Sequence, residues 1–216
     1  MHMHRIKAKP DWEYVAESER NSWQKLAAAS RGMATPGNMI TLFALSLVLA
    51  GSVLLLDRIY VVGFVMIATG RLLDFVDGAV AERTKTKGPL GEALDSVADK
   101  LAFLAVFIVF ALESIMPIIL LAGLLLLQLA NSTVVIAKKL RGINVHTTRY
   151  GKIEAAILWV TVGVFSVSFL LDRQDISPLL DVAVWVLATV LYLVTITLGL
   201  LTTRSYIRFG TKKPKK

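Results

Sequence analysis

The amino-acid sequence predicts an all-α integral membrane protein with six transmembrane helices and an amphipathic interfacial helix before the first of them. The chain of 216 residues is 55% hydrophobic and only 19% charged, and its mean hydropathy is +0.63. Soluble chains are typically about 45–50% apolar and about a quarter charged. The chain has no cysteine, which excludes disulfides, thiolate zinc sites, iron–sulfur clusters and cysteine catalysis.

Six apolar segments define the predicted spans, because a helix needs about 20 mostly apolar residues to cross a bilayer. Two of the segments are short, but each continues into a charged stretch that can still be helical. We interpret these two as spans whose inner halves carry function. The four long runs are Gly32 to Leu56, Ser114 to Ala137, Ala155 to Leu171 and Val182 to Thr203, and the short ones are Ile59 to Gly70 and Leu101 to Leu112.

The distribution of Lys and Arg predicts that both termini are cytoplasmic. Six of these residues precede the first span, three follow the second, five follow the fourth and six follow the sixth. Only Arg58 and Arg173 fall in the opposite loops, while Arg71 and Lys100 lie within spans. Short cytoplasmic loops are enriched in Lys and Arg, so we expect a multi-pass protein of the cell membrane in which the charged inner halves of the second and third spans face the cytoplasm.

The segment before the first span has apolar residues at helical spacing. This pattern predicts a helix lying on the cytoplasmic membrane surface, and a flexible basic leader is the alternative. We therefore expect three parts: a leader and juxtamembrane helix over 1–34, a six-helix membrane domain over 35–208 and a basic cytoplasmic tail over 209–216. The residues of the helical pattern, apolar except for Glu19, are Trp12, Val15, Ala16, Glu19, Trp23, Leu26 and Ala27.

Four aspartates lie in the inner halves of the second and third predicted spans. Asp74 and Asp77 are three residues apart and Asp95 and Asp99 are four apart, so each pair lies on one helix face. A short connection would hold the helices antiparallel with the pairs opposed. Ionisable groups in a membrane are costly and mark functional sites. Two divalent cations would neutralise them, and oxygen ligands suit Mg²⁺ or Mn²⁺, which keep positions open for substrate phosphates.

Three glycines accompany these aspartates, namely Gly78, Gly88 and Gly91. A missing side chain lets the backbone approach a phosphate, or lets two helices pack closely. Close packing is the simpler explanation for any one of them. Beside four aspartates we favour a phosphate site.

These residues resemble the signature of the CDP-alcohol phosphotransferase family, DxxDGxxAR, eight residues, then GxxxDxxxD. This sequence reads DFVDGAVAE, eight residues, then GEALDSVAD. The one departure is Glu82 in the arginine position, which in the family approaches the nucleotide phosphates, and Arg83 follows it directly. The segment from Thr35 to Thr41 also resembles the family's Pro-Asn-x-Ile-Thr segment, with Gly37 inserted. A helix start at Pro36 would explain that segment equally well.

The resemblance implies a homodimeric enzyme that transfers a phosphatidyl group from CDP-diacylglycerol to an acceptor hydroxyl and releases CMP. It implies two Mg²⁺ or Mn²⁺ ions per active site. By the matched positions, the metal ligands are Asp74, Asp77, Asp95 and Asp99, and Asp99 is also the general base. The residues expected to contact the CDP moiety are Asn38, Thr41, Gly78, Ala81, Arg83 and Gly91.

The acceptor is expected to be a small phosphorylated alcohol. Its phosphate is predicted to bind Lys139, Arg149, Lys152 and Arg204, although the positive-inside bias alone predicts a similar number of cations. The segments Leu94–Lys100 and Tyr150–Lys152 resemble phosphatidylglycerophosphate synthases, with Ser96 in place of a proline. Glycerol 3-phosphate is therefore favoured, and inositol phosphate or another alcohol is the alternative.

Two non-enzyme classes compete with this interpretation. A cation-coupled transporter would have charges near the membrane midplane and repeat symmetry between its halves, whereas these aspartates lie at the cytoplasmic ends of adjacent spans. A structural membrane protein leaves the four acids unexplained. No nucleic-acid partner is expected. Four polar residues of the fourth span are expected to form interhelical hydrogen bonds, and one of them, Asn131, could instead line the pocket: Gln128, Asn131, Ser132 and Thr133.

Overall fold

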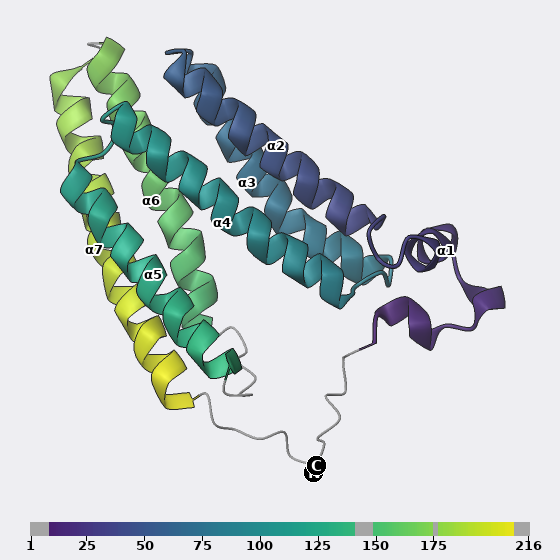
Figure 1. The fold of residues 1–216 in the computed structure, drawn as a ribbon. Coiled ribbons are helices and arrows are strands. Elements are labelled where there is room, and N and C mark those ends of the chain that lie inside the picture. Colours follow the sequence, from purple (N-terminus) through teal and green to yellow (C-terminus); the bar gives the residue numbers. More distant parts are fainter. Residues whose placement is uncertain (1–8, 141–148, 175–176, 210–216) are drawn as a thin grey trace. The chain divides into compact units, whose positions relative to one another are not determined.

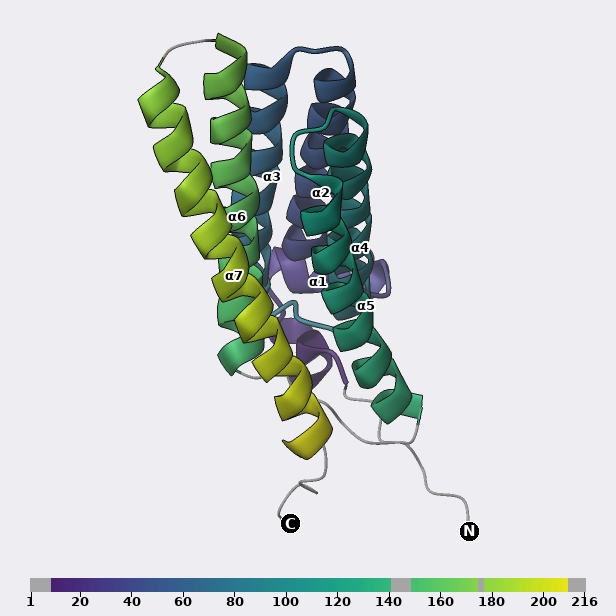
Figure 2. The ribbon, with the colours of Figure 1, turned by 90° about the vertical axis from the view of Figure 1, so that its left-hand side faces the viewer.

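The computed structural model describes residues 9–140, 149–174 and 177–209, which are all helical or connecting segments without a strand. The chain divides into two compact units, Met1–Val109 and Phe110–Lys216. Figure 1 shows the helices, and Figure 2 shows them turned by 90°. The elements are η1 (Asp11–Tyr14), η2 (Glu17–Glu19), α1 (Ser22–Ala29), α2 (Pro36–Leu56), α3 (Tyr60–Arg83), α4 (Pro89–Leu112), α5 (Ile118–Leu140), α6 (Arg149–Gln174) and α7 (Pro178–Phe209).

The segment before α2 does not form the single amphipathic helix that the sequence predicts. It contains two 3₁₀ turns and the eight-residue helix α1. A capping box starts α1 at Asn21: its side chain accepts the backbone N–H of Gln24, and the Gln24 side chain accepts the N–H of Asn21. Asn21 itself is extended, so the helix cannot continue backwards from this cap. The prediction of one helix from Trp12 to Ala27 is therefore wrong.

Trp12 packs inside the first unit, where it is only 5% exposed. A Cβ atom placed on Gly32 or Gly88 would lie 2.9 or 2.8 Å from the indole ring of Trp12. The ring thus fits between the connection that precedes α2 and the connection that precedes α4. This tryptophan stabilises the first unit rather than facing lipid.

Helices α2 and α3 run side by side in both views (Figures 1 and 2). Thr35 caps α2 by accepting the N–H of Asn38, and Pro36 occupies the first helical position, as the alternative explanation of this segment predicts. A Cβ on Gly70 would lie 2.6 Å from the carbonyl oxygen of Ala44, and one on Gly63 would lie 2.8 Å from that of Gly51. Small residues therefore bring the two backbones into contact, as is common between membrane helices.

Helices α5, α6 and α7 of the second unit are joined by polar side chains. Gln128 of α5 donates to Glu154 of α6 at 2.9 Å, and Thr203 of α7 donates to Asn131 of α5. These two bonds confirm the interhelical role predicted for Gln128 and Asn131. Thr133 instead donates to the carbonyl of Leu129 in its own helix.

Four of the described helices are long and apolar enough to cross a membrane: Pro36–Leu56, Ile118–Lys138, Arg149–Gln174 and Pro178–Arg208. Helices α3 and α4 each have 24 residues, or about 36 Å at 1.5 Å per residue, but the second half of α3 and the first half of α4 are charged. Many large apolar side chains are exposed on α2, including Phe43 at 58%. An exposed apolar helix surface of this kind suits a lipid environment.

Candidate active site

Three aspartates converge between α3 and α4, within the first unit. Asp74 of α3 and Asp95 and Asp99 of α4 each offer one carboxylate oxygen, and these three oxygens lie within 4.8 Å of one another. The spacing of four residues between Asp95 and Asp99 places both on one face of α4, as predicted. A cluster of carboxylate oxygens without nitrogen or sulfur is the ligand set that Mg²⁺ and Mn²⁺ prefer. The residues present therefore fit a divalent metal.

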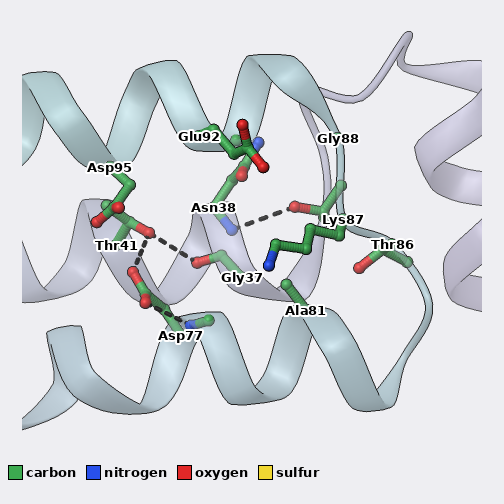
Figure 3. Close-up of a pocket in the computed structure, with 13 residues that line it drawn as sticks. Gly37, Asn38, Thr41, Asp77, Ala81, Thr86, Lys87, Gly88, Glu92 and Asp95 are labelled. Atoms are coloured by element: carbon green, nitrogen blue, oxygen red, sulfur yellow. Dashed lines mark hydrogen bonds between the residues drawn. The ribbon is translucent and has the colours of Figure 1, made fainter. Parts of the chain in front are cut away.

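Asp77 points to a different neighbour. It is 6% exposed, and its carboxylate accepts hydrogen bonds from the hydroxyl of Thr41 in α2 and from the backbone N–H of Gly78. Figure 3 shows the Thr41 and Asp77 side chains facing each other. The structure thus brings three of the four predicted ligands together and holds the fourth against α2.

Arg71 is a member of the site that the sequence interpretation missed. Its Nη2 lies 3.0 Å from Oδ2 of Asp74 and 2.8 Å from Oδ1 of Asp99. Its side chain is 10% exposed. Two signals pointed to it: Arg71 is three residues before Asp74 and so shares its helix face, and a cation inside an apolar span needs a partner.

A pocket lies beside the aspartates (Figure 3). It is formed by the start of α2, the second half of α3, the α3–α4 connection and the start of α4. Five of the six residues predicted to contact CDP line it, namely Asn38, Thr41, Gly78, Ala81 and Gly91. The sixth, Arg83, is exposed and does not line it. Its other lining residues are Thr35, Gly37, Asp77, Thr86, Lys87, Gly88, Glu92 and Asp95.

The glycines at the pocket separate into two kinds. A Cβ on Gly78 would meet no atom within 4 Å, so this glycine faces open space. A Cβ on Gly91 would lie 2.9 Å from Oδ1 of Asn38, and Gly88 packs against Trp12. Gly91 and Gly88 are therefore explained by packing. Gly78 has the open surface that close approach of a phosphate requires.

Asn38 holds the backbone that leads into α2. Its Nδ2 donates to the carbonyls of Gly32 and Met33 at 2.9 and 3.0 Å, and the residue is 5% exposed. The bond to the Gly32 carbonyl is buried, and together the two bonds fix the backbone just before α2. Asn38 thus shapes one wall of the pocket, while Thr35 serves as the helix cap.

The predicted acceptor-binding cations belong to the second unit. Arg149 and Lys152 at the start of α6 and Arg204 near the end of α7 are exposed. The side chain of Lys139 lies outside the described residues, as do residues 210–216 of the expected tail. Neighbouring Lys138 has a structural role, because its Nζ donates to the carbonyls of Tyr206 and Ile207 in the last turn of α7.

An uncharacterized protein of Aquifex aeolicus (strain VF5) is 41% identical over 63 residues, which are 29% of this chain and 32% of that protein. The match thus spans about a third of that relative. No solved structure matches the chain. A family model described as CDP-alcohol phosphatidyltransferase matches residues 34–201, which include the aspartate cluster and the pocket. The chain therefore belongs to the CDP-alcohol phosphatidyltransferase family.

Proposed function

We propose that this protein transfers a phosphatidyl group from CDP-diacylglycerol to the hydroxyl of a small polar acceptor and releases CMP. The observation that carries this proposal is the convergence of Asp74, Asp95 and Asp99 within 4.8 Å, beside a pocket formed by the same helices. Membership of the family supports the reaction class. The enzyme would contribute to phospholipid biosynthesis in the membrane.

Members of the family use divalent metals, and the aspartate cluster suits them. We propose that Asp74, Asp95 and Asp99 hold Mg²⁺ or Mn²⁺, two ions per active site, and that Asp77 becomes the fourth ligand when it releases Thr41. Bound divalent ions supply positive charge that offsets the diphosphate and the negative charge developing on the transferred group.

Asp99 is the proposed general base. Its side chain is 48% exposed, whereas that of Asp74 is 12% exposed, so Asp99 is the more accessible to an entering hydroxyl. Arg71 binds Oδ1 of Asp99 and leaves the other oxygen to accept the hydroxyl proton. The acceptor oxygen then bonds to the β-phosphorus, while the bond from that phosphorus to the bridging oxygen breaks and CMP leaves with the electron pair.

The pocket is the proposed site of the CDP moiety. Gly78 offers the open backbone surface for the diphosphate. Thr41 and Asn38 offer polar side chains at the wall formed by α2. Ala81 and Gly91 also line the pocket, and their small size leaves room for the ligand between the helices.

The acceptor we propose is glycerol 3-phosphate, which would make the protein a phosphatidylglycerophosphate synthase. The support is the Gly151-Lys152 pair at the start of α6 together with the exposed cations Arg149 and Arg204. Guanidinium and ammonium groups bind phosphate strongly. Inositol phosphate is the alternative acceptor that the same cations would serve.

We further propose six membrane spans, cytoplasmic termini and a homodimer. Helices α3 and α4 supply the two spans beyond the four recognised by composition, with their charged halves at the cytoplasmic surface. Labelling of introduced cysteines at residues 58 and 173 from outside intact cells would test the topology. Light scattering of the protein in detergent would test the dimer.

The decisive experiment offers four acceptors separately to the purified full-length protein. CDP-diacylglycerol in mixed micelles is supplied with Mg²⁺ or Mn²⁺, and glycerol 3-phosphate, inositol phosphate, inositol or serine is added. We expect CMP release with glycerol 3-phosphate, its loss with EDTA and its return with excess metal. Release with inositol phosphate alone would replace the proposed acceptor, and absence of release with every alcohol would overturn the proposed reaction.

A further inference from the structure

The pocket beside the aspartate cluster has an unbalanced charge. Among the described residues that line it, Asp77, Glu92 and Asp95 are acidic, and Lys87 is the one cation. A CDP-linked lipid brings a diphosphate, which a carboxylate-lined wall repels. Metal ions at the cluster would offset the negative charge of the aspartates near them. A phosphate farther along the pocket would need another cation to bind.

The end of α3 contributes no cation to the lining of the pocket. The residue at the arginine position of the family signature is Glu82, and its neighbour Arg83 is the last residue of α3. Both side chains are exposed, and neither lines the pocket. Position 82 lies one turn after Gly78 but carries a carboxylate, and Arg83 at the end of the helix does not line the pocket.

The α3–α4 connection holds Lys87 at the pocket instead. The carbonyl of Lys87 accepts the N–H of Asp11 at 2.9 Å, and the next residue, Gly88, is packed against Trp12. On the other side, the N–H of Thr86 donates to the carbonyl of Ala81 at 2.9 Å. The backbone on both sides of Lys87 is therefore anchored.

The side chain of Lys87 lies along the pocket. Figure 3 shows it extending from the connection toward Gly37 and Ala81, with its nitrogen at the pocket. Lysine carries a compact charge on a flexible stem, so it can follow a phosphate without the fixed geometry that an arginine needs.

We propose that Lys87 binds the diphosphate of the CDP-linked substrate and so supplies the positive charge that Glu82 cannot. This inference rests on the proposed function, in which the pocket holds the CDP moiety. Lys87 would therefore determine affinity for the CDP-linked lipid and leave affinity for the acceptor unaffected.

The test compares the wild-type protein with Lys87→Met, Lys87→Arg and the matched control Arg83→Met, which removes an exposed cation four residues away. For each purified full-length protein, CMP release is measured while CDP-diacylglycerol and the acceptor are varied in turn. Binding of CMP in the presence of Mg²⁺ is measured by calorimetry, and the thermal midpoint is recorded to confirm that the variants fold.

We expect Lys87→Met to raise the KM for CDP-diacylglycerol about tenfold, the loss of one charge-assisted contact, with the acceptor KM unchanged. Lys87→Arg should recover most of the loss, and Arg83→Met should stay close to the wild type. If the wild-type protein is active but Lys87→Met leaves the KM for CDP-diacylglycerol unchanged, or Arg83→Met raises it instead, the role of Lys87 alone is overturned. A wild-type protein that releases no CMP with any acceptor would overturn the proposed function itself.

Discussion

Arg71 and Asp99, 28 residues apart in the sequence, form an ion pair that joins α3 to α4, with Nη2 2.8 Å from Oδ1. The same nitrogen lies 3.0 Å from Asp74. Arg71 therefore neutralises part of the acidic cluster from within the protein. A divalent cation binding there would meet carboxylates that already have a positive partner.

Replacing Arg71 with methionine should lower the thermal stability of the metal-free protein and increase the stabilisation that metal binding gives. Without the guanidinium, Asp74 and Asp99 repel each other, and the charge of the mostly buried Asp74 loses its positive partner. We expect the thermal midpoint in EDTA to fall by several degrees, and Mn²⁺ to raise it by more than in the wild type. The measurement is thermal unfolding in detergent with and without Mn²⁺, with Arg83→Met as the control. If Mn²⁺ shifted the thermal midpoint equally in the wild type and in Arg71→Met, Arg71 would not compete with the metal for the carboxylates.

Asp99→Asn should abolish CMP release without unfolding the protein. An amide cannot accept the hydroxyl proton, and loss of a general base lowers rates by about 10²–10⁴-fold. The side chain is 48% exposed, so the replacement leaves the packing intact. Asp57→Asn, at the C-cap of α2, is the control and should keep its activity. Near-normal turnover in Asp99→Asn would remove its role as the base.

Two glycine replacements should separate binding from packing. Gly78→Ala adds a methyl group where no atom lies within 4 Å, so the thermal midpoint should hold or rise slightly because alanine favours helix. The methyl group occupies pocket space, so the KM for CDP-diacylglycerol should rise. Gly70→Ala places its Cβ 2.6 Å from the carbonyl of Ala44 and should lower the thermal midpoint. A larger loss of stability in Gly78→Ala than in Gly70→Ala would contradict this assignment.

Trp12→Ala should destabilise the first unit and weaken substrate binding together. Trp12 is 5% exposed and packs against Gly88, next to Lys87, and truncation of a buried tryptophan costs about 3–5 kcal/mol. We expect a lower thermal midpoint and a higher KM for CDP-diacylglycerol. Trp23→Ala is the matched control, because Trp23 is 44% exposed. Equal effects of the two replacements would show that Trp12 does not position the connection.

Two cations of the second unit should behave differently. Arg204→Met should raise the KM for glycerol 3-phosphate about tenfold, as expected for loss of one charged phosphate contact, and leave that for CDP-diacylglycerol unchanged. Lys138→Met should lower the thermal midpoint instead, because Lys138 bonds the carbonyls of Tyr206 and Ile207. Steady-state kinetics and thermal unfolding of both variants test this. An unchanged acceptor KM in Arg204→Met would remove Arg204 from the acceptor site.

The sequence alone located the six long helices and the start of the first. Uncharged length determines where a membrane helix can form, and Thr35 followed by Pro36 determines where α2 begins. The spacing of Asp95 and Asp99 also determined that they share a face of α4. These are properties of a single helix and its neighbours in the chain, so they need no tertiary contacts.

Only the tertiary structure decided which of these faces meet. The rotation of α3 against α2 turns Asp77 to Thr41, while the meeting of α3 and α4 gives Arg71 its two carboxylates. The packing of Trp12 against Gly88 likewise places Lys87 at the pocket. Periodicity describes one helix at a time, whereas a binding site depends on the rotation and contacts of several elements, which packing between residues distant in the sequence determines.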